Sequence, residues 1–151
     1  MSVRRIDHVG LTVPDLEAAS TFLAAAFDAP VIHDIVSEPL AGPEIEGALG
    51  LPTGAVVRKV RQVRIGDGAT LELFEIASSD QREPVRLCDL GVQHLAVLVD
   101  DIHAAVRRAT EAGAVLLADP APLPGPEAGP GRMWVYCQLP WGGLLELVSR
   151  P

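Results

Sequence analysis

The sequence is poor in several features that mark particular classes of protein. Cysteine occurs only at Cys88 and Cys137, too few residues and too far apart for a zinc knuckle or a disulfide framework. No apolar run reaches the length of a membrane span or of a signal-peptide core, so we expect neither. The twelve basic residues are outnumbered by twenty acidic ones, which argues against a nucleic-acid partner because phosphate binding needs a basic face. The expectation is a cytoplasmic globular protein that binds neither nucleic acid nor a membrane.

One stretch of the chain occurs twice. Ile6–Ala19 recurs as Val92–Ala105, with a histidine, the strand-ending valine, an aspartate and a pair of alanines in register. Downstream of each copy, Leu71–Leu73 is matched by Leu145–Leu147, each a glutamate between two leucines. Each half therefore opens on a strand that carries a histidine and closes on a strand that carries a glutamate. This pattern indicates a duplicated module.

The duplication predicts an α+β fold in one domain, residues 1–151, made of modules 4–77 and 92–149. Alternating and β-branched residues predict strands over 4–13, 30–36, 56–65, 69–77, 92–99, 114–118, 133–139 and 144–149. Apolar residues at helical spacing predict one helix after each of Asp15 and Asp101, which are good N-caps. Each half is then βαβββ. Two such halves can form a cupped mixed sheet with the helices outside.

Two connections between these elements are expected to be irregular. Ser37–Gly54 is rich in proline and glycine, and its middle has room for a helical turn. Asp119–Arg132 holds five prolines and three glycines, so we expect a loop that does not pack as core and serves as a lid over the cup.

Strand alternation places His8, Glu72, His94 and Glu146 on the helix-free side of their strands. Two histidines and two carboxylates at one concave site suit a divalent metal ion such as Zn, Ni, Co, Mn or Fe(II). A lone histidine or glutamate in a strand is ordinarily a core or solvent-facing residue. Recurrence at equivalent places favours the metal site. His33 and His103 do not recur, and we expect both to be structural.

Further residues share the parity of the cup. Phe74, Trp134 and Tyr136 would form an apolar wall. Gln62 and Arg64 would add polar contacts, and Arg64 would suit an anionic substrate. Ordinary packing or solvation is the alternative for each of these five substrate-binding candidates.

The stretch IDHVGLTVPDL, paired with QHLAVLVDDI further along, resembles the vicinal oxygen chelate superfamily. That group includes glyoxalase I, methylmalonyl-CoA epimerase, extradiol dioxygenases, and the fosfomycin and bleomycin resistance proteins. The resemblance runs from about Arg4 to Val148. It implies two paired βαβββ modules, metal positions at His8, Glu72, His94 and Glu146, and a homodimer, since some relatives build each cup from two chains.

The His/Glu/His/Glu set is similar to that of bacterial-type glyoxalase I and close to that of the epimerase. It implies a metal-dependent lyase or isomerase that acts through a metal-chelated enediolate of a small oxo- or hydroxy-carbonyl substrate. Glu146 would be the base, and Glu72 the second catalytic carboxylate. The chain departs from the epimerase in lacking a glutamate on the strand before Glu72, and from glyoxalase I in lacking a basic glutathione-binding pattern.

Two alternatives stay open at this level. The first is an Fe(II)-dependent oxygenase or another natural-product tailoring enzyme, in which Glu72 would be surplus to the usual two histidines and one carboxylate. The second is a drug-sequestering resistance protein, against which an intact ligand set counts.

Overall fold

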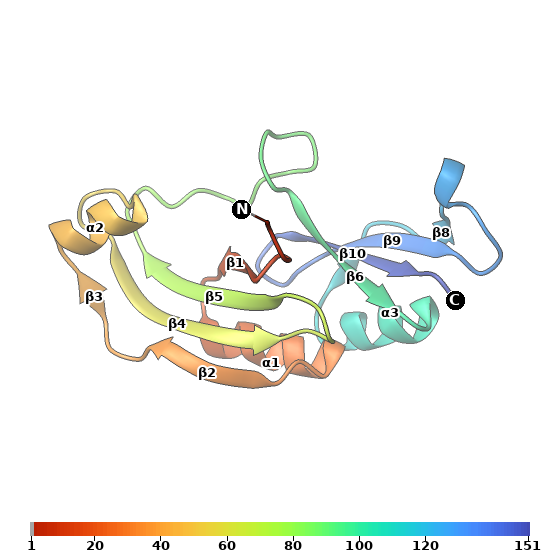
Figure 1. Cartoon of the computed structure of the whole chain (residues 1–151), viewed down its shortest axis with the longest axis horizontal. Coiled ribbons are helices and arrows are strands. Elements are labelled where there is room, and N and C mark those ends of the chain that lie inside the picture. Colours follow the sequence, from red (N-terminus) through yellow and green to blue (C-terminus); the bar gives the residue numbers. More distant parts are fainter. Residues whose placement is uncertain (1) are drawn as a thin grey trace. The chain divides into compact units, whose positions relative to one another are not determined.

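The computed structural model describes residues 2–151, which form two compact modules, each with its own mixed β-sheet (Figure 1). Module 1 comprises the residues up to Ala24 together with Asp28–Arg82, and module 2 comprises Ala25–Phe27 and Glu83–Pro151. Among the described residues, no helix is both long and apolar enough to cross a membrane.

Module 1 has five strands and two helices, which follow in the order β1 (His8–Thr12), α1 (Leu16–Phe27), β2 (Val31–Val36), β3 (Leu40–Ala41), α2 (Pro43–Leu49), β4 (Val56–Arg64) and β5 (Thr70–Ala77). The last three residues of α1 are the ones that belong to module 2. The sheet order is β1-β5-β4-β2, with the short β3 also paired to β4. β1 runs parallel to β5, and the other pairs are antiparallel.

Module 2 repeats this arrangement with β6 (His94–Val99), α3 (Ile102–Glu111), β7 (Val115–Leu116), β8 (Ala121–Pro122), the 3₁₀ turn η1 (Gly125–Glu127), β9 (Met133–Gln138) and β10 (Leu144–Ser149). The sheet order is β6-β10-β9-β7, with β8 also paired to β9. β6 is parallel to β10, as β1 is to β5. The predicted α+β fold with a duplicated module is confirmed.

Alternation along the strands separates the two faces of each sheet. In β5, Leu71 and Leu73 are at most 2% exposed, and they lie on the face that α1 covers. In β10 the corresponding residues are Leu145 and Leu147, at most 1% exposed. The glutamate between each leucine pair therefore points to the opposite face, which we call the open face of its module.

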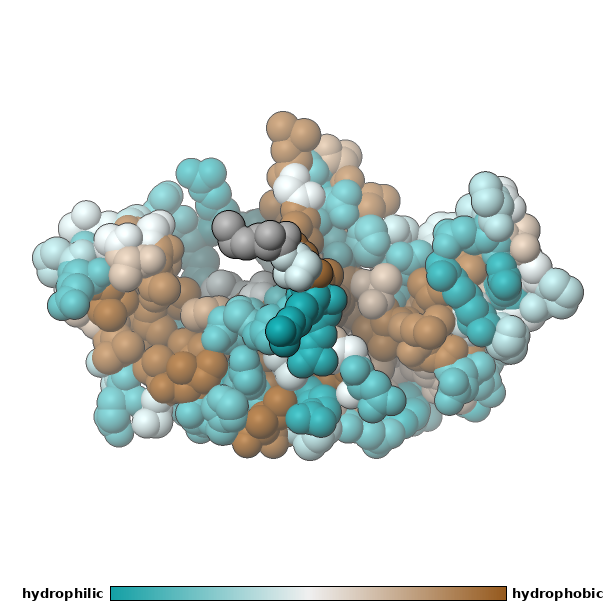
Figure 2. Space-filling view, viewed as in Figure 1, coloured by the Kyte–Doolittle hydropathy of each residue, from teal (hydrophilic) through white to brown (hydrophobic). Residues whose placement is uncertain are grey.

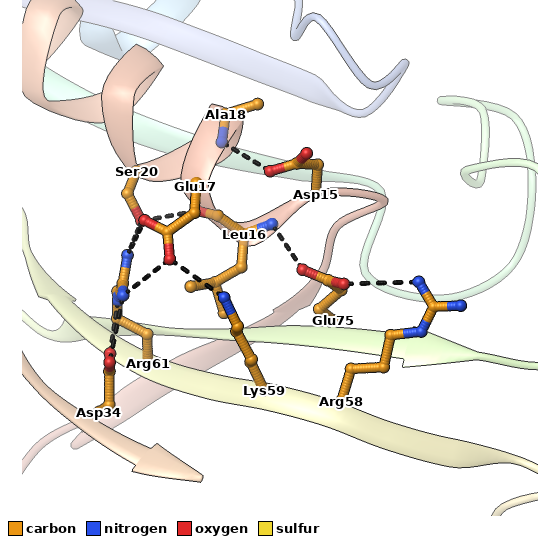
Figure 3. A network of polar contacts seen from close by, with 10 residues as sticks. All are labelled: Asp15, Leu16, Glu17, Ala18, Ser20, Asp34, Arg58, Lys59, Arg61 and Glu75. Atoms are coloured by element: carbon orange, nitrogen blue, oxygen red, sulfur yellow. Dashed lines mark hydrogen bonds and ion pairs between the residues drawn. The ribbon is translucent and has the colours of Figure 1, made fainter. Parts of the chain in front are cut away.

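Helix α1 is tied to its sheet by charged side chains (Figure 3). Asp15 caps the helix through a 2.8 Å bond from the Ala18 amide. Arg61 of β4 donates to Glu17 of α1 and, through two nitrogens, to both carboxylate oxygens of Asp34 on β2. This network lies on the helix-covered face and leaves the open face free for other side chains.

Three strands are shorter than the sequence pattern predicts by two or more residues. β7 covers only Val115–Leu116 of the predicted 114–118, β1 begins at His8 rather than at Arg4, and β6 begins at His94 rather than at Val92. His8 stands opposite Thr70, the first residue of β5, and His94 stands opposite Leu144, the first residue of β10. A strand ends where its hydrogen-bonding partner ends, so each histidine takes the first place of its strand.

Most of Asp119–Arg132 is irregular as predicted, but the prediction that it does not pack as core is wrong. The segment contains β8 and η1, and Leu123 is only 5% exposed. β8 is an edge strand that pairs only with β9. A proline is tolerated in an edge strand because one side of that strand needs no hydrogen-bond donors. The helical turn predicted within Ser37–Gly54 is present as the helix α2, which has Pro43 in its first turn.

Candidate functional site

In module 1, His8 and Glu72 form a pair on the open face. The His8 Nε2 atom lies 3.4 Å from the Glu72 Oε2 atom, and the two side chains are 41% and 17% exposed. Glu72 stands opposite Gly10, two residues after His8 on β1. Gly10 contributes no side chain, so the space beside Glu72 on this strand stays open to His8.

Module 2 contains the same pair from equivalent places. The His94 Nε2 atom lies 3.3 Å from the Glu146 Oε2 atom, and the side chains are 27% and 16% exposed. Glu146 stands opposite Ala96, two residues after His94 on β6. The small residue at this place in both modules again leaves room between histidine and glutamate.

The other ring nitrogen of each histidine contacts the side chain of the preceding residue. The His8 Nδ1 atom lies 3.0 Å from an Asp7 carboxylate oxygen, and the His94 Nδ1 atom lies 2.9 Å from the Gln93 amide oxygen. An oxygen acceptor at Nδ1 favours the tautomer that carries the proton there, which leaves the Nε2 lone pair directed at the glutamate. The hydrogen bond to Asp7, and then the charge of Glu72, raise the pKa of His8.

Sequence reasoning missed the roles of Asp7 and Gln93, although the sequence carried a signal. Each recurring histidine is preceded by a residue with a side-chain oxygen. Residues next to each other in a strand ordinarily point to opposite faces, so this contact was not expected. It is possible here because both residues lie just before the first residue of the strand.

Within neither module does a third His, Cys, Asp or Glu side chain complete a group suited to a metal ion, for the residues that the structure describes. Each module thus supplies one histidine and one glutamate. That the four residues share one site stays a prediction.

The predicted polar contacts of module 1 lie on the open face. Gln62 stands directly opposite Glu72 and is half-buried, and Arg64 stands opposite Thr70 and is exposed. Phe74 stands opposite Thr12 and is half-buried. The face is therefore polar around His8 and Glu72 and apolar toward Phe74.

In module 2, one aromatic ring contacts the histidine and a second ring contacts the first. Tyr136 stands opposite Glu146, and its ring meets the His94 ring edge to face at 5.2 Å between centroids. Trp134 meets Tyr136 in the same manner at 5.3 Å, and its indole N–H donates to the Pro122 carbonyl at 3.2 Å. A cavity of about 110 Å³ lies between these rings and Leu117–Asp119. The start of the proline-rich segment thus borders a cavity lined by Tyr136, the residue whose ring contacts His94.

Sequence reasoning set His33 aside as structural. In the sheet of module 1, His33 stands opposite Gln62, which stands opposite Glu72. No repeat in the sequence signals this position, because it depends on the register between β2 and β4.

Comparison with known proteins agrees with these observations. Residues 7–130 match the family model described as the Glyoxalase/Bleomycin resistance protein/Dioxygenase superfamily. The chain belongs to this superfamily. The resemblance drawn from the sequence motifs is thereby confirmed.

One curated relative is similar over almost the whole chain. It is the 2-epi-5-epi-valiolone epimerase of Actinomyces sp, 37% identical over 149 residues that cover 97% of this chain and 79% of that protein. With an epimerase as a relative over this length, we conclude that the chain is an enzyme of the superfamily.

Solved structures share the fold at lower identity. A glyoxalase family protein from Bacillus cereus has a TM-score of 0.76 at 20% identity, covering 99% of this chain and 95% of that one. Glyoxalase I from Zea mays has a TM-score of 0.66 at 17% identity, covering 97% of this chain but 44% of the maize protein. A fosfomycin resistance protein from Listeria monocytogenes has a TM-score of 0.64 at 16% identity, covering 99% of this chain and 96% of that one. At these identities the likeness concerns the fold alone.

Proposed function

We propose that the chain is an epimerase that inverts a carbon next to the carbonyl group of a small hydroxylated ketone. The observation that carries this proposal is the 37% identity to an epimerase over almost the whole chain. That enzyme is named for 2-epi-5-epi-valiolone, and the ending -one denotes a ketone. The His–Glu pair in each module supports the proposal because it supplies carboxylates for proton transfer.

The donor atoms fit a divalent metal ion. The Nε2 and Oε2 atoms of each pair lie 3.3–3.4 Å apart, and in the favoured tautomer both present lone pairs to each other. Such a contact is favourable only when a proton or a cation lies between the two atoms. Metal bonds of about 2.0–2.1 Å place neighbouring N and O ligands roughly 3–3.4 Å apart. His8, Glu72, His94 and Glu146 would hold the ion.

When bound, such an ion acts as a Lewis acid that polarises the substrate carbonyl and makes the adjacent C–H bond more acidic. Asp7 and Gln93 orient the two histidines through their Nδ1 atoms. These contacts hold the Nε2 atoms in place before substrate arrives, so the site is preorganised.

Glu146 is the base in this proposal. Its carboxylate removes the proton from the carbon beside the carbonyl, and the electron pair of the broken C–H bond moves toward the carbonyl oxygen. A proton returned to the other face of the same carbon completes the inversion, and Glu72 is the second carboxylate for that step. No atom is gained or lost by the substrate, so no co-reactant is needed.

The test uses 2-epi-5-epi-valiolone as the candidate substrate. Purified protein supplied with Zn, Ni, Co, Mn or Fe(II) in turn is incubated with it in heavy water, and proton NMR follows the loss of the signal beside the carbonyl. We expect loss of that signal and the appearance of an epimer. The hemithioacetal of methylglyoxal and glutathione serves as the lyase control, and no turnover of it is expected. Tight binding of the ketone without exchange, under all five metals, would instead favour a sequestering protein.

A further inference from the structure

His33 ends a row of polar residues that crosses the open face of module 1. Glu72 on β5 stands opposite Gln62 on β4, and Gln62 stands opposite His33 on β2. Residues directly opposite each other in a ladder project to the same face. Neighbouring strands lie about 4.8 Å apart, so the backbone of His33 lies roughly 10 Å from that of Glu72.

Asp34, the neighbour of His33, is held by side-chain hydrogen bonds, whereas the His33 ring makes none among the described residues. Asp34 points to the helix-covered face, where Arg61 bonds both of its carboxylate oxygens (Figure 3). Within residues 2–151, neither the His33 imidazole nor the Gln62 side-chain amide makes a hydrogen bond. His33 is exposed, and Gln62 is half-buried. Both have free donors and acceptors on the face that carries the His8–Glu72 pair.

The surroundings of His33 make its polarity notable. β2 reads VIHDIV, and hydrophobic residues reach the surface along β2 and β3 (brown in Figure 2), where Val31, Ile35 and Leu40 are exposed. Strands of this kind form from β-branched residues without any help from a histidine.

The second module shows that the fold itself does not require this row. There the equivalent row runs from Ala96 through Glu146 to Tyr136, and it reaches the backbone amide of Leu117, which donates to the Tyr136 carbonyl. No histidine or glutamine occupies it. Since the two sheets share one topology, the glutamine and histidine of this row are specific to module 1.

We propose that His33 and Gln62 bind hydroxyl groups of the substrate on the side of Glu72 away from His8. The matching substrate is a ketone with several hydroxyl groups, of sugar size, whose far hydroxyls reach the His33 imidazole. This inference rests on the proposed function, because it assigns a substrate class to the same site. His33 acts in binding and takes no part in proton transfer.

The experiment compares His33→Ala, His33→Gln and His103→Ala in turnover of 2-epi-5-epi-valiolone. His103 is the matched control because it is exposed on α3 and its hydrogen bond to the helix cap comes from its backbone amide, which the substitution keeps. One lost hydrogen bond predicts a KM raised about 3- to 10-fold in His33→Ala, with kcat within about twofold of wild type. His33→Gln should restore KM to within about twofold, because its amide can still donate and accept. His103→Ala should match wild type.

A second readout separates this inference from the proposed function. The imidazole C–H signal of His33, assigned by its loss in His33→Ala, is followed by NMR as the ketone is added. A saturable shift with 2-epi-5-epi-valiolone but not with cyclohexanone supports the binding role, even where the wild type turns nothing over and the proposed epimerisation fails. An unchanged KM in His33→Ala, when the wild type is active, overturns the inference. The inference is also overturned if the His33 imidazole signal does not shift when 2-epi-5-epi-valiolone is added.

Discussion

Tyr136 stands directly opposite Glu146 in the ladder of β9 and β10. Burial, and then the negative charge of Glu146, raise the pKa of the Tyr136 phenol. The phenol therefore stays protonated at neutral pH and cannot serve there as a base. Of these two neighbours, the carboxylate is the group able to accept a proton from carbon.

Replacing Glu146 by glutamine should separate catalysis from binding. The amide keeps the shape and an oxygen donor but is a very poor base, so turnover should fall on the order of 10²-fold or more. Exchange of the proton beside the carbonyl with deuterium, measured by NMR on 2-epi-5-epi-valiolone, should stop. Glu72→Gln should be milder. Glu111→Gln, at the exposed end of α3, is the control and should behave as wild type. Undiminished exchange in Glu146→Gln would remove Glu146 as the base.

Metal content tests the four-residue site. Because each module supplies one histidine and one glutamate, purified protein should bind about one divalent ion per chain. Each of His8→Ala and His94→Ala should lower occupancy strongly, and the double variant should abolish it while the circular dichroism spectrum is kept. His103→Ala should bind metal as wild type does, measured by elemental analysis. Full occupancy in the double variant would refute the assignment.

Arg61 should stabilise the fold in a way that depends on pH. The Arg61 guanidinium lowers the pKa values of both Glu17 and Asp34 in the folded state. The two carboxylates therefore contribute fully to the free energy of unfolding at pH values above their ordinary pKa values of 4.5 (Glu17) and 3.8 (Asp34). This contribution is lost as the pH falls through their lower pKa values in the folded state. Both carboxylates are substantially exposed, which weakens the effect by solvent screening.

Arg61→Ala should lower the free energy of unfolding at neutral pH by about 1–2 kcal/mol. Urea titrations at neutral pH and in the acid range would measure it, and the difference between variant and wild type should shrink toward the acid end. Arg82→Ala, an exposed arginine at the end of module 1, is the control and should change little at either pH. A difference that grows in acid would contradict the assigned ion pairs.

The two thiols should differ in reactivity. Cys88 is exposed, whereas Cys137 on β9 has no exposed surface, and burial raises the pKa of its thiol to about 11. The thiolate is the reactive form, so one thiol per chain should react readily with an alkylating reagent under native conditions. In Cys88→Ser, labelling should appear only with denaturant and should follow unfolding. Rapid native labelling of Cys88→Ser would show that β9 opens locally.

Much of the architecture could be read from the sequence because it depends on local rules. Alternation in strands follows from backbone geometry, so the faces of Leu71, Glu72 and Leu73 follow from the identity of β5 alone. The caps at Asp15 and Asp101 are likewise local, and both side chains accept hydrogen bonds from the first turn of their helices. The duplicated motif was sufficient to indicate the superfamily.

Other features depend on which distant segments pair, and the tertiary structure alone decides them. β1 begins at His8 because its partner begins at Thr70. The proline-rich segment forms β8 because the edge of β9 offers it hydrogen bonds, and no local pattern of Ala121 and Pro122 indicates that. His33 enters the row with Gln62 through a register that contains bulges on either side of it. A bulge changes which residues stand opposite each other without changing the residues themselves, so only the paired strands could reveal that row.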